Sequence, residues 1–230
     1  MVNKIENMYL KIPKKFLKKV ENPNYELHKI NLPFRMCIIA PSGSGKTNFL
    51  INLISLFSKN NGTFSSIQII TKNKDEPLYN WLSSIDKSII ITEGINSIPK
   101  LDEFDSSNSH IVIIDDLVLS KDLSSIENYY IRARKLNVSV IFISQSFYRI
   151  PKIIRQNCSY FAILKLGGNR EINMILSEFA LGIDKTTLLK LYDYATKEKF
   201  QCLFIDLEAT EEKRFRKGLN EILDVAADFT

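Results

Sequence analysis

The sequence has few of the residues that mark secreted, fibrous or membrane-spanning chains. Its 230 residues include three cysteines, seven prolines, eight glycines and one tryptophan. Cys37, Cys158 and Cys202 lie far apart inside apolar stretches, so we expect buried, reduced thiols and a reducing compartment. No apolar run approaches the roughly 20 residues that span a bilayer, and the first residues lack a signal-peptide pattern. We therefore expect no membrane span and no secretion.

The remaining composition is that of a folded globular protein. Hydrophobic residues make up 45% of the chain and charged residues 25%, which argues against disorder. A length of 230 residues is enough to bury one full α/β core but short of what two such domains need. One domain with small appendages is expected.

The net charge of +5 is concentrated at the start of the chain. Lys4, Lys11, Lys14, Lys15, Lys18 and Lys19 are opposed there by Glu6 alone. A basic arm of this kind commonly meets a phosphate backbone or an anionic partner, and a solvated, solubilising extension explains it equally well. We assign residues 1–30 to a basic N-terminal arm that packs on the sheet edge or on a neighbour, and residues 31–230 to the main domain.

Short runs rich in isoleucine and valine alternate with helix-like segments. Strands are expected at residues 34–40, 66–71, 88–92, 110–115, 138–144, 160–166 and 200–206. Helices are expected at residues 47–58, 76–84, 123–135, 172–180, 186–195 and 211–225. This alternation predicts an α/β fold with βαβ units around a mostly parallel central sheet flanked by helices.

A glycine-bearing turn follows the first expected strand. It consists of Ala40, Pro41, Ser42, Gly43, Ser44, Gly45, Lys46 and Thr47, the spacing of a Walker A loop with alanine where glycine is more usual. Gly43 and Gly45 let successive backbone N–H groups point at the oxygens of the β- and γ-phosphates. Lys46 adds a positive charge, and the Thr47 hydroxyl ligates Mg²⁺. The flanking strand and helix favour a P-loop that binds MgATP over a plain Gly/Ser turn.

Asp115 ends the apolar run 110–115 and Asp116 follows it directly, so the run resembles a Walker B motif. In an open parallel sheet, the ligand lies beyond the carboxyl ends of the strands, so this pair and the P-loop can face one crevice. Asp115 is predicted to hold Mg²⁺, and Asp116 to position or deprotonate the attacking water. Many ATPases have glutamate at the position of Asp116. Aspartate is shorter than glutamate by one methylene, so the water would have to lie closer. A helix N-cap or turn residue is the alternative for Asp116.

Further candidates come from the next strand and from the arginines. Gln145 ends the run 138–144 and could contact the γ-phosphate or the attacking water; a turn-forming polar residue is the alternative. Charge on the transferred phosphoryl group also needs a cationic partner. The arginines of the central region are Arg132, Arg134, Arg149, Arg155 and Arg170, and surface arginines are often merely solvated.

The combination of residues 40–47, Asp115-Asp116 and Gln145 resembles the FtsK/HerA superfamily of nucleic-acid-pumping ATPases. Within that superfamily, the segments 134–145, 150–151 and 154–157 resemble the poxvirus-type genome-packaging ATPases of large DNA viruses and virophages. The similarity covers residues 33–207, and its anchor motifs are more specific than the stretches between them. The resemblance implies a RecA-like core and a catalytic role for Lys46.

The same resemblance implies how the protein works. Subunits would form a homo-oligomeric ring of five or six, with each active site at a subunit boundary. ATP hydrolysis would drive double-stranded DNA through the ring into a preformed capsid, which makes a capsid protein a further partner. The host cytoplasm, in the viral factory, and the virion are the implied locations. Arg134, Arg155 and Arg170 lie in segments with family counterparts, so each is a candidate to reach a neighbour's ATP.

Other classes of P-loop protein remain as alternatives. A nucleotide or nucleoside kinase needs a lid with arginines and an acceptor pocket, and the aspartate pair followed by Gln145 suits a water-activating motor better. A GTPase switch would need a guanine-reading NKxD element, but Asn73-Lys74-Asp75-Glu76 ends in glutamate and comes too early. An ABC-type ATPase would need an LSGGQ-like signature, which is absent from the sequence.

Overall fold

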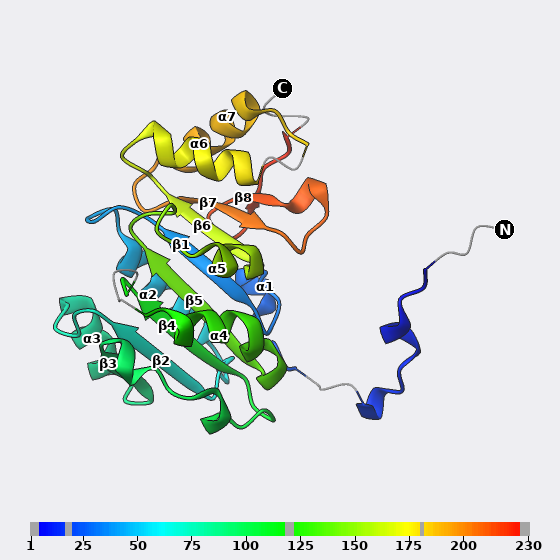
Figure 1. Ribbon diagram of the computed structural model, residues 1–230, viewed down its shortest axis with the longest axis vertical. Helices are drawn as coiled ribbons and strands as arrows, with labels where there is room; N and C mark the ends of the chain where they lie inside the picture. Colours follow the sequence, from blue (N-terminus) through cyan, green and yellow to red (C-terminus); the bar gives the residue numbers. More distant parts are fainter. Residues whose placement is uncertain (1–4, 17–19, 118–121, 180–181, 226–230) are drawn as a thin grey trace.

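A computed structural model describes residues 5–16, 20–117, 122–179 and 182–225 of the protein. In these residues one sheet has the strand order β3-β2-β4-β5-β1-β6-β7-β8-β9 (Figure 1). The strands are β1 (Arg35–Ile39), β2 (Ser66–Thr71), β3 (Ile89–Glu93), β4 (His110–Asp115), β5 (Val138–Ser144), β6 (Tyr160–Leu164), β7 (Cys202–Asp206), β8 (Phe215–Lys217) and β9 (Glu221–Ile222). Strands β1 to β6 pair in parallel, and β7 to β9 are added antiparallel.

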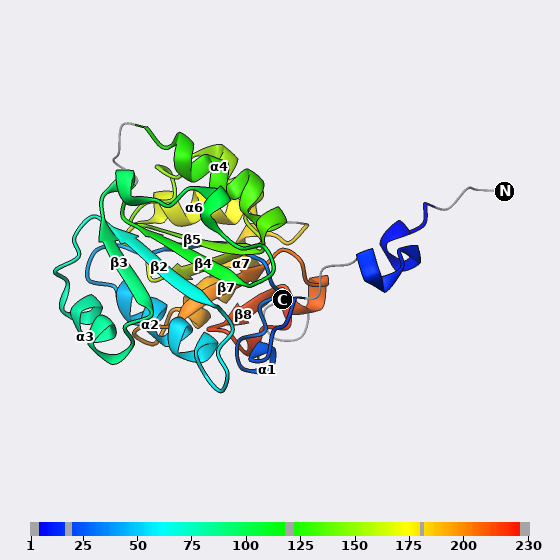
Figure 2. The ribbon, with the colours of Figure 1, turned by 90° about the horizontal axis from the view of Figure 1, so that it is seen from below.

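Helices cover both faces of this sheet. They are α1 (Tyr25–His28), α2 (Lys46–Phe57), α3 (Pro77–Ile85), α4 (Ser124–Arg132), α5 (Lys152–Asn157), α6 (Asn169–Glu178) and α7 (Lys185–Ala195). Short 3-10 helices occupy Met8–Lys11, Lys14–Phe16, Ile95–Ser97, Leu101–Glu103, Ala133–Leu136 and Glu211–Lys213. Helices α2 and α3 pack on one face, with α1 beside α2, and α4 to α7 pack on the other (Figure 2). Within the described ranges, no helix has the length and apolar character needed to cross a bilayer.

The central strands are hydrophobic throughout because both of their faces are covered. All residues of β4 and β5 are buried. Along β4, Ile111 and Ile113 face the core under α2 and α3, whereas Val112 and Ile114 face the core under α4 to α7. The seven expected strands are all present, with ends within two residues of the predicted ones, and the predicted fold class is confirmed.

The helix predicted at residues 211–225 is wrong. After a 3-10 turn, this segment forms β8 and β9, and β8 pairs with β7 through Ile205 and Phe215. Without this pairing, the backbone N–H and C=O groups on the outer edge of β7 would have no partners. In addition, Gly218 has φ of 59°, a conformation that a right-handed helix does not allow, and it turns the chain between β8 and β9. Two smaller differences are that α5 was not expected, and that the helix expected at 123–135 becomes a 3-10 helix after Arg132. The predicted helix end at Ala180 lies outside the described residues.

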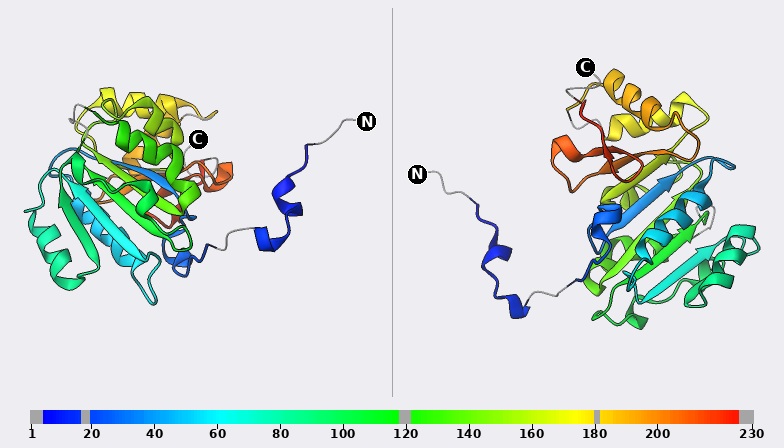
Figure 3. Two further views of the ribbon diagram at one scale, coloured as in Figure 1. Left: turned by 60° about the horizontal axis from the view of Figure 1, so that its bottom comes forward. Right: turned by 180° about the vertical axis from the view of Figure 1, so that it is seen from behind.

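The N-terminal region divides into two parts. Residues 5–16 lie away from the rest of the chain (Figures 1 and 3), with Ile5 96% and Leu10 84% exposed. Residues 22–31 instead pack on the domain, where Asn24 is buried and donates hydrogen bonds to the carbonyl oxygens of Phe57 (3.0 Å) and Lys59 (2.9 Å). A packed segment therefore precedes the boundary placed at residue 30. Of the lysines in the predicted arm, Lys4, Lys18 and Lys19 lie outside the described residues.

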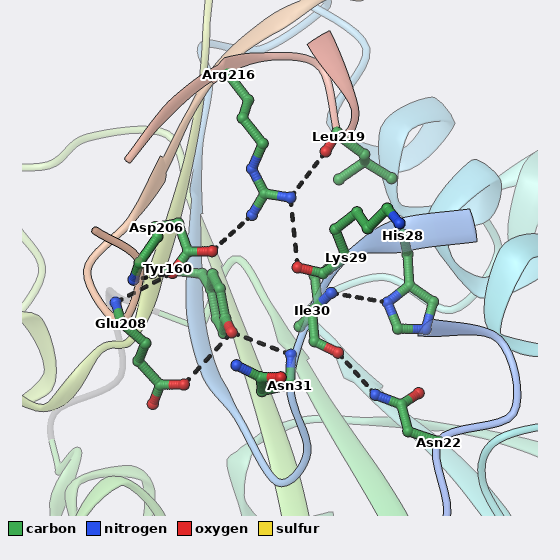
Figure 4. Close-up of polar contacts among 11 residues, drawn as sticks. Asn22, His28, Lys29, Ile30, Asn31, Tyr160, Asp206, Glu208, Arg216 and Leu219 are labelled. Atoms are coloured by element: carbon green, nitrogen blue, oxygen red, sulfur yellow. Dashed lines mark hydrogen bonds and ion pairs between the residues drawn. The ribbon is translucent and has the colours of Figure 1, made fainter. Parts of the chain in front are cut away.

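A group of polar residues, most of them buried, which we call the anchor cluster, joins the packed N-terminal segment to the C-terminal strands (Figure 4). The anchor cluster consists of His28, Lys29, Asn31, Tyr160, Asp206 and Arg216. Arg216 donates to the Asp206 carboxylate at 2.9 Å and to the carbonyl oxygens of Leu219 (2.9 Å) and Lys29 (3.3 Å). The Tyr160 hydroxyl accepts a hydrogen bond from the Asn31 backbone N–H at 3.0 Å. These contacts hold the two ends of the domain together.

The three cysteines are buried free thiols, as expected. Cys37 on β1 and Cys158 before β6 have their sulfur atoms 3.3 Å apart. Burial raises the pKa of the Cys158 thiol, and the contact with Cys37 raises it further, so the protonated form is favoured.

Candidate active site

The P-loop connects the end of β1 to the start of α2 at the carboxyl edge of the sheet, the edge where β1 to β6 end. Gly43 and Gly45 adopt φ of 74° and 93°, in the left-handed region, so the loop needs glycine at both positions. The first turn of α2 begins at Lys46, and its N–H groups have no acceptors within the helix. The Lys46 ammonium donates to the carbonyl oxygen of Pro41 at 3.1 Å. This geometry is that of a phosphate-binding loop at a helix N-terminus.

A cavity of 740 Å³ lies over this loop. The predicted residues that line it are Ser42, Gly43, Gly45, Lys46, Thr47, Asp115, Asp116 and Gln145. The structure therefore brings the P-loop, the aspartate pair and the glutamine into one space. Its volume falls within the range of about 300–1,000 Å³ that is usual for ligand pockets.

Asp115 is buried at the end of β4 and accepts hydrogen bonds from the Tyr79 hydroxyl (2.7 Å) and, at 3.4 Å, the Thr71 hydroxyl. Burial raises the pKa of its carboxyl, and the neighbouring negative charges of Glu76 and Asp116 act in the same direction. No lysine or arginine of the described residues forms an ion pair with it. A cation bound beside Asp115 would relieve this unfavourable environment.

The residues present fit a magnesium ion bound through phosphate oxygens. The described residues contain no group of three or more His, Cys, Asp or Glu side chains suited to hold a metal by themselves. Mg²⁺ in nucleotide sites needs no such group, because it takes one or two protein oxygens and completes its shell with water and phosphate. Thr47 and Asp115 both line the cavity and offer oxygens of the required kind.

Asp116 and Gln145 form a pair at the ends of β4 and β5. Gln145 Nε2 donates to Asp116 Oδ2 at 2.8 Å, and the Asp116 N–H donates to the Ile143 carbonyl oxygen at 3.1 Å. Asp116 has φ of 56°, a conformation uncommon for aspartate, which turns the chain away from the strand. It caps no described helix, since α4 starts at Ser124 with Leu123 at its N-cap. The turn and the bond to Gln145 orient its carboxylate.

The three candidate arginines lie in different places, and none of them lines the cavity in the described part of the chain. Arg134 precedes β5 and lies at the amino edge of the sheet, where β1 to β6 begin. Burial lowers the pKa of the neighbouring Arg35, and the positive charge of Arg134 lowers it further. Arg155 in α5 is held by an ion pair with Glu178. Arg170 is exposed in the first turn of α6, on the carboxyl edge.

Several residues around the cavity were not expected from the sequence. Thr71 ends β2, Asn73 follows it, Glu76 precedes α3, and Phe200 precedes β7. Thr71 ends a parallel strand, so the rule that placed Asp115 and Gln145 could have found it. Phe200 lies in an irregular loop and has no motif around it.

Comparison with known proteins agrees with this geometry. The chain is 28% identical over 194 residues to the DNA packaging protein OPG160 of vaccinia virus (strain Copenhagen), covering 78% of this chain and 70% of the relative. The same protein of variola virus gives the same identity and coverage.

Solved structures share the fold. The genome packaging NTPase B204 of Sulfolobus turreted icosahedral virus 2 in complex with ATP-gammaS matches with a TM-score of 0.54 at 14% identity, over 78% of this chain and 94% of that one. The cytoplasmic domain of the type VII secretion ATPase EccC of Thermomonospora curvata matches with a TM-score of 0.52 at 15% identity, over 78% of this chain and 24% of that one.

The family model described as "Poxvirus A32 protein" matches residues 24–208. That range starts in the packed N-terminal segment, contains the P-loop, the aspartate pair and Gln145, and ends just after β7. With most of its length and its whole candidate site inside the match, the chain belongs to the poxvirus A32 protein family.

Proposed function

We propose that this protein is an ATP-hydrolysing motor that moves double-stranded DNA and packages a viral genome into a preformed capsid. The observation that carries the proposal is that the P-loop, the Asp115-Asp116 pair and Gln145 line one cavity. The family membership and the printed name of the relatives, DNA packaging protein, support the nature of the cargo.

The residues of the cavity divide the work of phosphoryl transfer. The loop N–H groups and Lys46 would hold the β- and γ-phosphate oxygens, and Thr47 and Asp115 would hold Mg²⁺. Mg²⁺, when bound, neutralises negative charge on those oxygens. Asp116 would accept the proton of the attacking water or orient it, and the hydrogen bond from Gln145 fixes the direction of its carboxylate.

A homo-oligomeric ring of five or six subunits would complete the site. The transferred phosphoryl group needs positive charge beyond Lys46, and no arginine of the described residues lines the cavity. Arg134 and Arg170 are exposed and could reach a neighbouring subunit, whereas Arg155 is engaged by Glu178 within its own subunit. If Arg134 or Arg170 acts on a neighbour's ATP, its alanine variant should be inactive alone but should regain hydrolysis when mixed with Lys46→Ala subunits. The Lys46→Ala subunit supplies the arginine, and the arginine variant supplies an intact P-loop. Mixed Arg155→Ala subunits are the matched comparison.

The remaining assignments concern the surroundings of the motor. Arg149 and Lys152 are exposed and could contact DNA phosphates in the ring, while Arg155, three residues after Lys152, is half-buried. The basic arm within residues 1–30 would bind DNA or a capsid protein, with residues 31–230 forming the ATPase domain. The protein would act in the viral factory of the host cytoplasm and be retained in the virion.

Measuring ATP hydrolysis with and without double-stranded DNA tests the proposal. The motor predicts Mg²⁺-dependent phosphate release that DNA stimulates, and Lys46→Ala should abolish it. A nucleotide kinase would show no stimulation by DNA and would instead consume ATP when a phosphate acceptor is added. Hydrolysis that is indifferent to DNA would count against a DNA motor even if ATP binds.

A further inference from the structure

Phe200 is an aromatic residue in a strained position beside the P-loop. It lies between α7 and β7, with φ of 69°, in the left-handed region that bulky residues rarely adopt. Its side chain remains 44% exposed, so its contribution to the core is small for a phenylalanine. A residue that is both strained and exposed is not explained by packing.

The ring of Phe200 is in contact with the P-loop itself. A Cβ atom built on Gly45 would lie 2.4 Å from Phe200 Cδ1 and 2.9 Å from Cε1, so the ring occupies the place of a side chain at Gly45. Glycine at this position therefore serves two purposes: it allows φ of 93°, and it lets an aromatic ring reach the loop.

Phe200 lines two cavities. One is the 740 Å³ cavity of the phosphate site, and the other is a cavity of 490 Å³ that Ser44 of the P-loop, Lys165, Asp193 and Gln201 help to line. The two cavities thus meet at the P-loop and at Phe200, and only the first contains the acidic pair.

The order of the strands gives the direction in which a nucleotide would lie. Asp115 and Gln145 end β4 and β5, on one side of β1, whereas Phe200 precedes β7, on the other side. A nucleotide whose γ-phosphate and Mg²⁺ are held beside Asp115 and Gln145 would have that end toward β4 and β5. Its nucleoside would then extend toward β6 and β7, where Phe200 and the second cavity lie.

We propose that Phe200 is the surface on which the base of the bound nucleotide stacks, and that the 490 Å³ cavity receives the nucleoside. The inference rests on the proposed function, because it presupposes a nucleotide in the P-loop. An aromatic ring stacks on any base through its π-face, so Phe200 supplies affinity with little choice between adenine and guanine. The Lys199 ammonium lies over the Phe200 ring, 5.3 Å from its centroid, and this cation–π contact helps to fix the orientation of the ring.

The test compares binding of a nucleotide with binding of its phosphate chain alone. Phe200→Gly removes the ring with a residue that adopts φ of 69° without strain, so the loop is kept. In calorimetric titrations with Mg²⁺, this variant should bind ATPγS about tenfold or more weakly, the scale of one base–aromatic stack, and bind tripolyphosphate as the wild type does. Phe200→Tyr should keep ATPγS affinity within about threefold, since it retains the stack. Tyr194→Ala, which removes an aromatic of 42% exposure that lines neither cavity, should leave both affinities unchanged.

Two results would overturn the inference while leaving the ATPase proposal intact. One is that Phe200→Gly binds ATPγS as tightly as the wild type. The other is that its affinities for ATPγS and tripolyphosphate fall by the same factor, which would make Phe200 a support of the P-loop. A wild-type protein that binds neither ligand would instead overturn the proposed function and this inference with it.

Discussion

The carboxyl and amino edges of the sheet each hold a buried aspartate, and the two carboxylates have different surroundings. Asp206 in the anchor cluster accepts hydrogen bonds from Arg216 at 2.9 Å and from the backbone N–H groups of Glu208 and Ala209 at 3.0 and 3.1 Å. Asp115 has two neutral hydroxyl donors and acidic neighbours. Burial raises the pKa of both carboxyls; the paired Arg216 opposes this at Asp206, whereas at Asp115 the opposition comes from the Tyr79 hydrogen bond and from the charge of Lys46, which forms no ion pair with it.

The difference separates structural from functional polar groups. The anchor cluster finds its partners within the chain, since its members come from the N-terminal segment and from β6, β7 and β8 (Figure 4). Asp115 lies beside a cavity, and although the Tyr79 hydroxyl and the charge of Lys46 favour its ionised form, it has no ion-pair partner among the described residues, so a cation bound in the cavity would stabilise it further. Substitutions at the amino edge should therefore change stability, and substitutions at the carboxyl edge should change turnover.

The largest effect should come from Asp116→Asn. The amide can neither accept the proton of the water nor carry the charge that orients it, so the rate of ATP hydrolysis should fall by a factor of about 10²–10⁴. Nucleotide affinity and thermal stability should remain close to those of the wild type. Steady-state phosphate release, calorimetry and thermal denaturation measure the three quantities, with exposed Asp102→Asn as the control. A normal rate of hydrolysis would remove Asp116 from the mechanism.

The matching change at the other edge is Arg216→Met. It leaves Asp206 buried without its cation, and breaking a buried ion pair typically costs about 3–5 kcal/mol of folding free energy. Urea denaturation should show this loss, while ATPγS affinity of the folded variant stays unchanged. In the double variant Asp206→Asn/Arg216→Met, much of the loss should be recovered, because no unpaired charge remains. If the double variant were as unstable as Arg216→Met, the charge would not be the cause.

A smaller effect is expected from Asp115→Asn in the absence of Mg²⁺ and nucleotide. The pKa of Asp115 is raised above its usual value of 3.8 in the folded state, so above pH 3.8 the folded chain keeps a proton that the unfolded chain has lost. The wild type therefore loses stability as the pH rises from 3.8 through the raised pKa. The variant lacks this loss. At pH 7, it should be as stable as the wild type or more stable by about 1 kcal/mol, with the difference disappearing toward pH 4. Its affinity for ATPγS should depend less on Mg²⁺ than that of the wild type, since Thr47 and the phosphate oxygens would remain as ligands.

The residues at the carboxyl edge of the sheet could be predicted from the sequence, whereas those of the anchor cluster could not. The strands under both helical layers are continuous apolar runs, and Asp115, Asp116 and Gln145 follow two of them directly, so the topology of a parallel sheet places them together. Whether any of them binds its expected ligand remains a prediction.

The parts that could not be predicted depend on contacts between distant segments. Arg216 meets Asp206 and Lys29 only because β8 adds to the edge of β7, in a segment whose sequence favoured a helix. Phe200 reaches Gly45 from an irregular loop more than 150 residues away in the sequence. No local period or spacing encodes such pairs.

The smallest expected effect concerns His28 in the anchor cluster. Its Nδ1 accepts the Ile30 N–H at 3.0 Å, so the proton of the neutral ring is on Nε2, which faces no hydrogen-bond partner among the described residues. Burial, together with the charge of Arg216, lowers the pKa of His28 from 6.5 to about 4. The unfolded chain therefore binds a proton more readily than the folded one between these values, and stability is lost as the pH falls from 6.5 toward 4. His28→Asn keeps a side-chain acceptor but cannot titrate, so denaturation curves across this range should show a weaker loss of stability toward acid than the wild type. An acid limb that is identical in His28→Asn and the wild type would show that the amino edge does not sense pH through this ring.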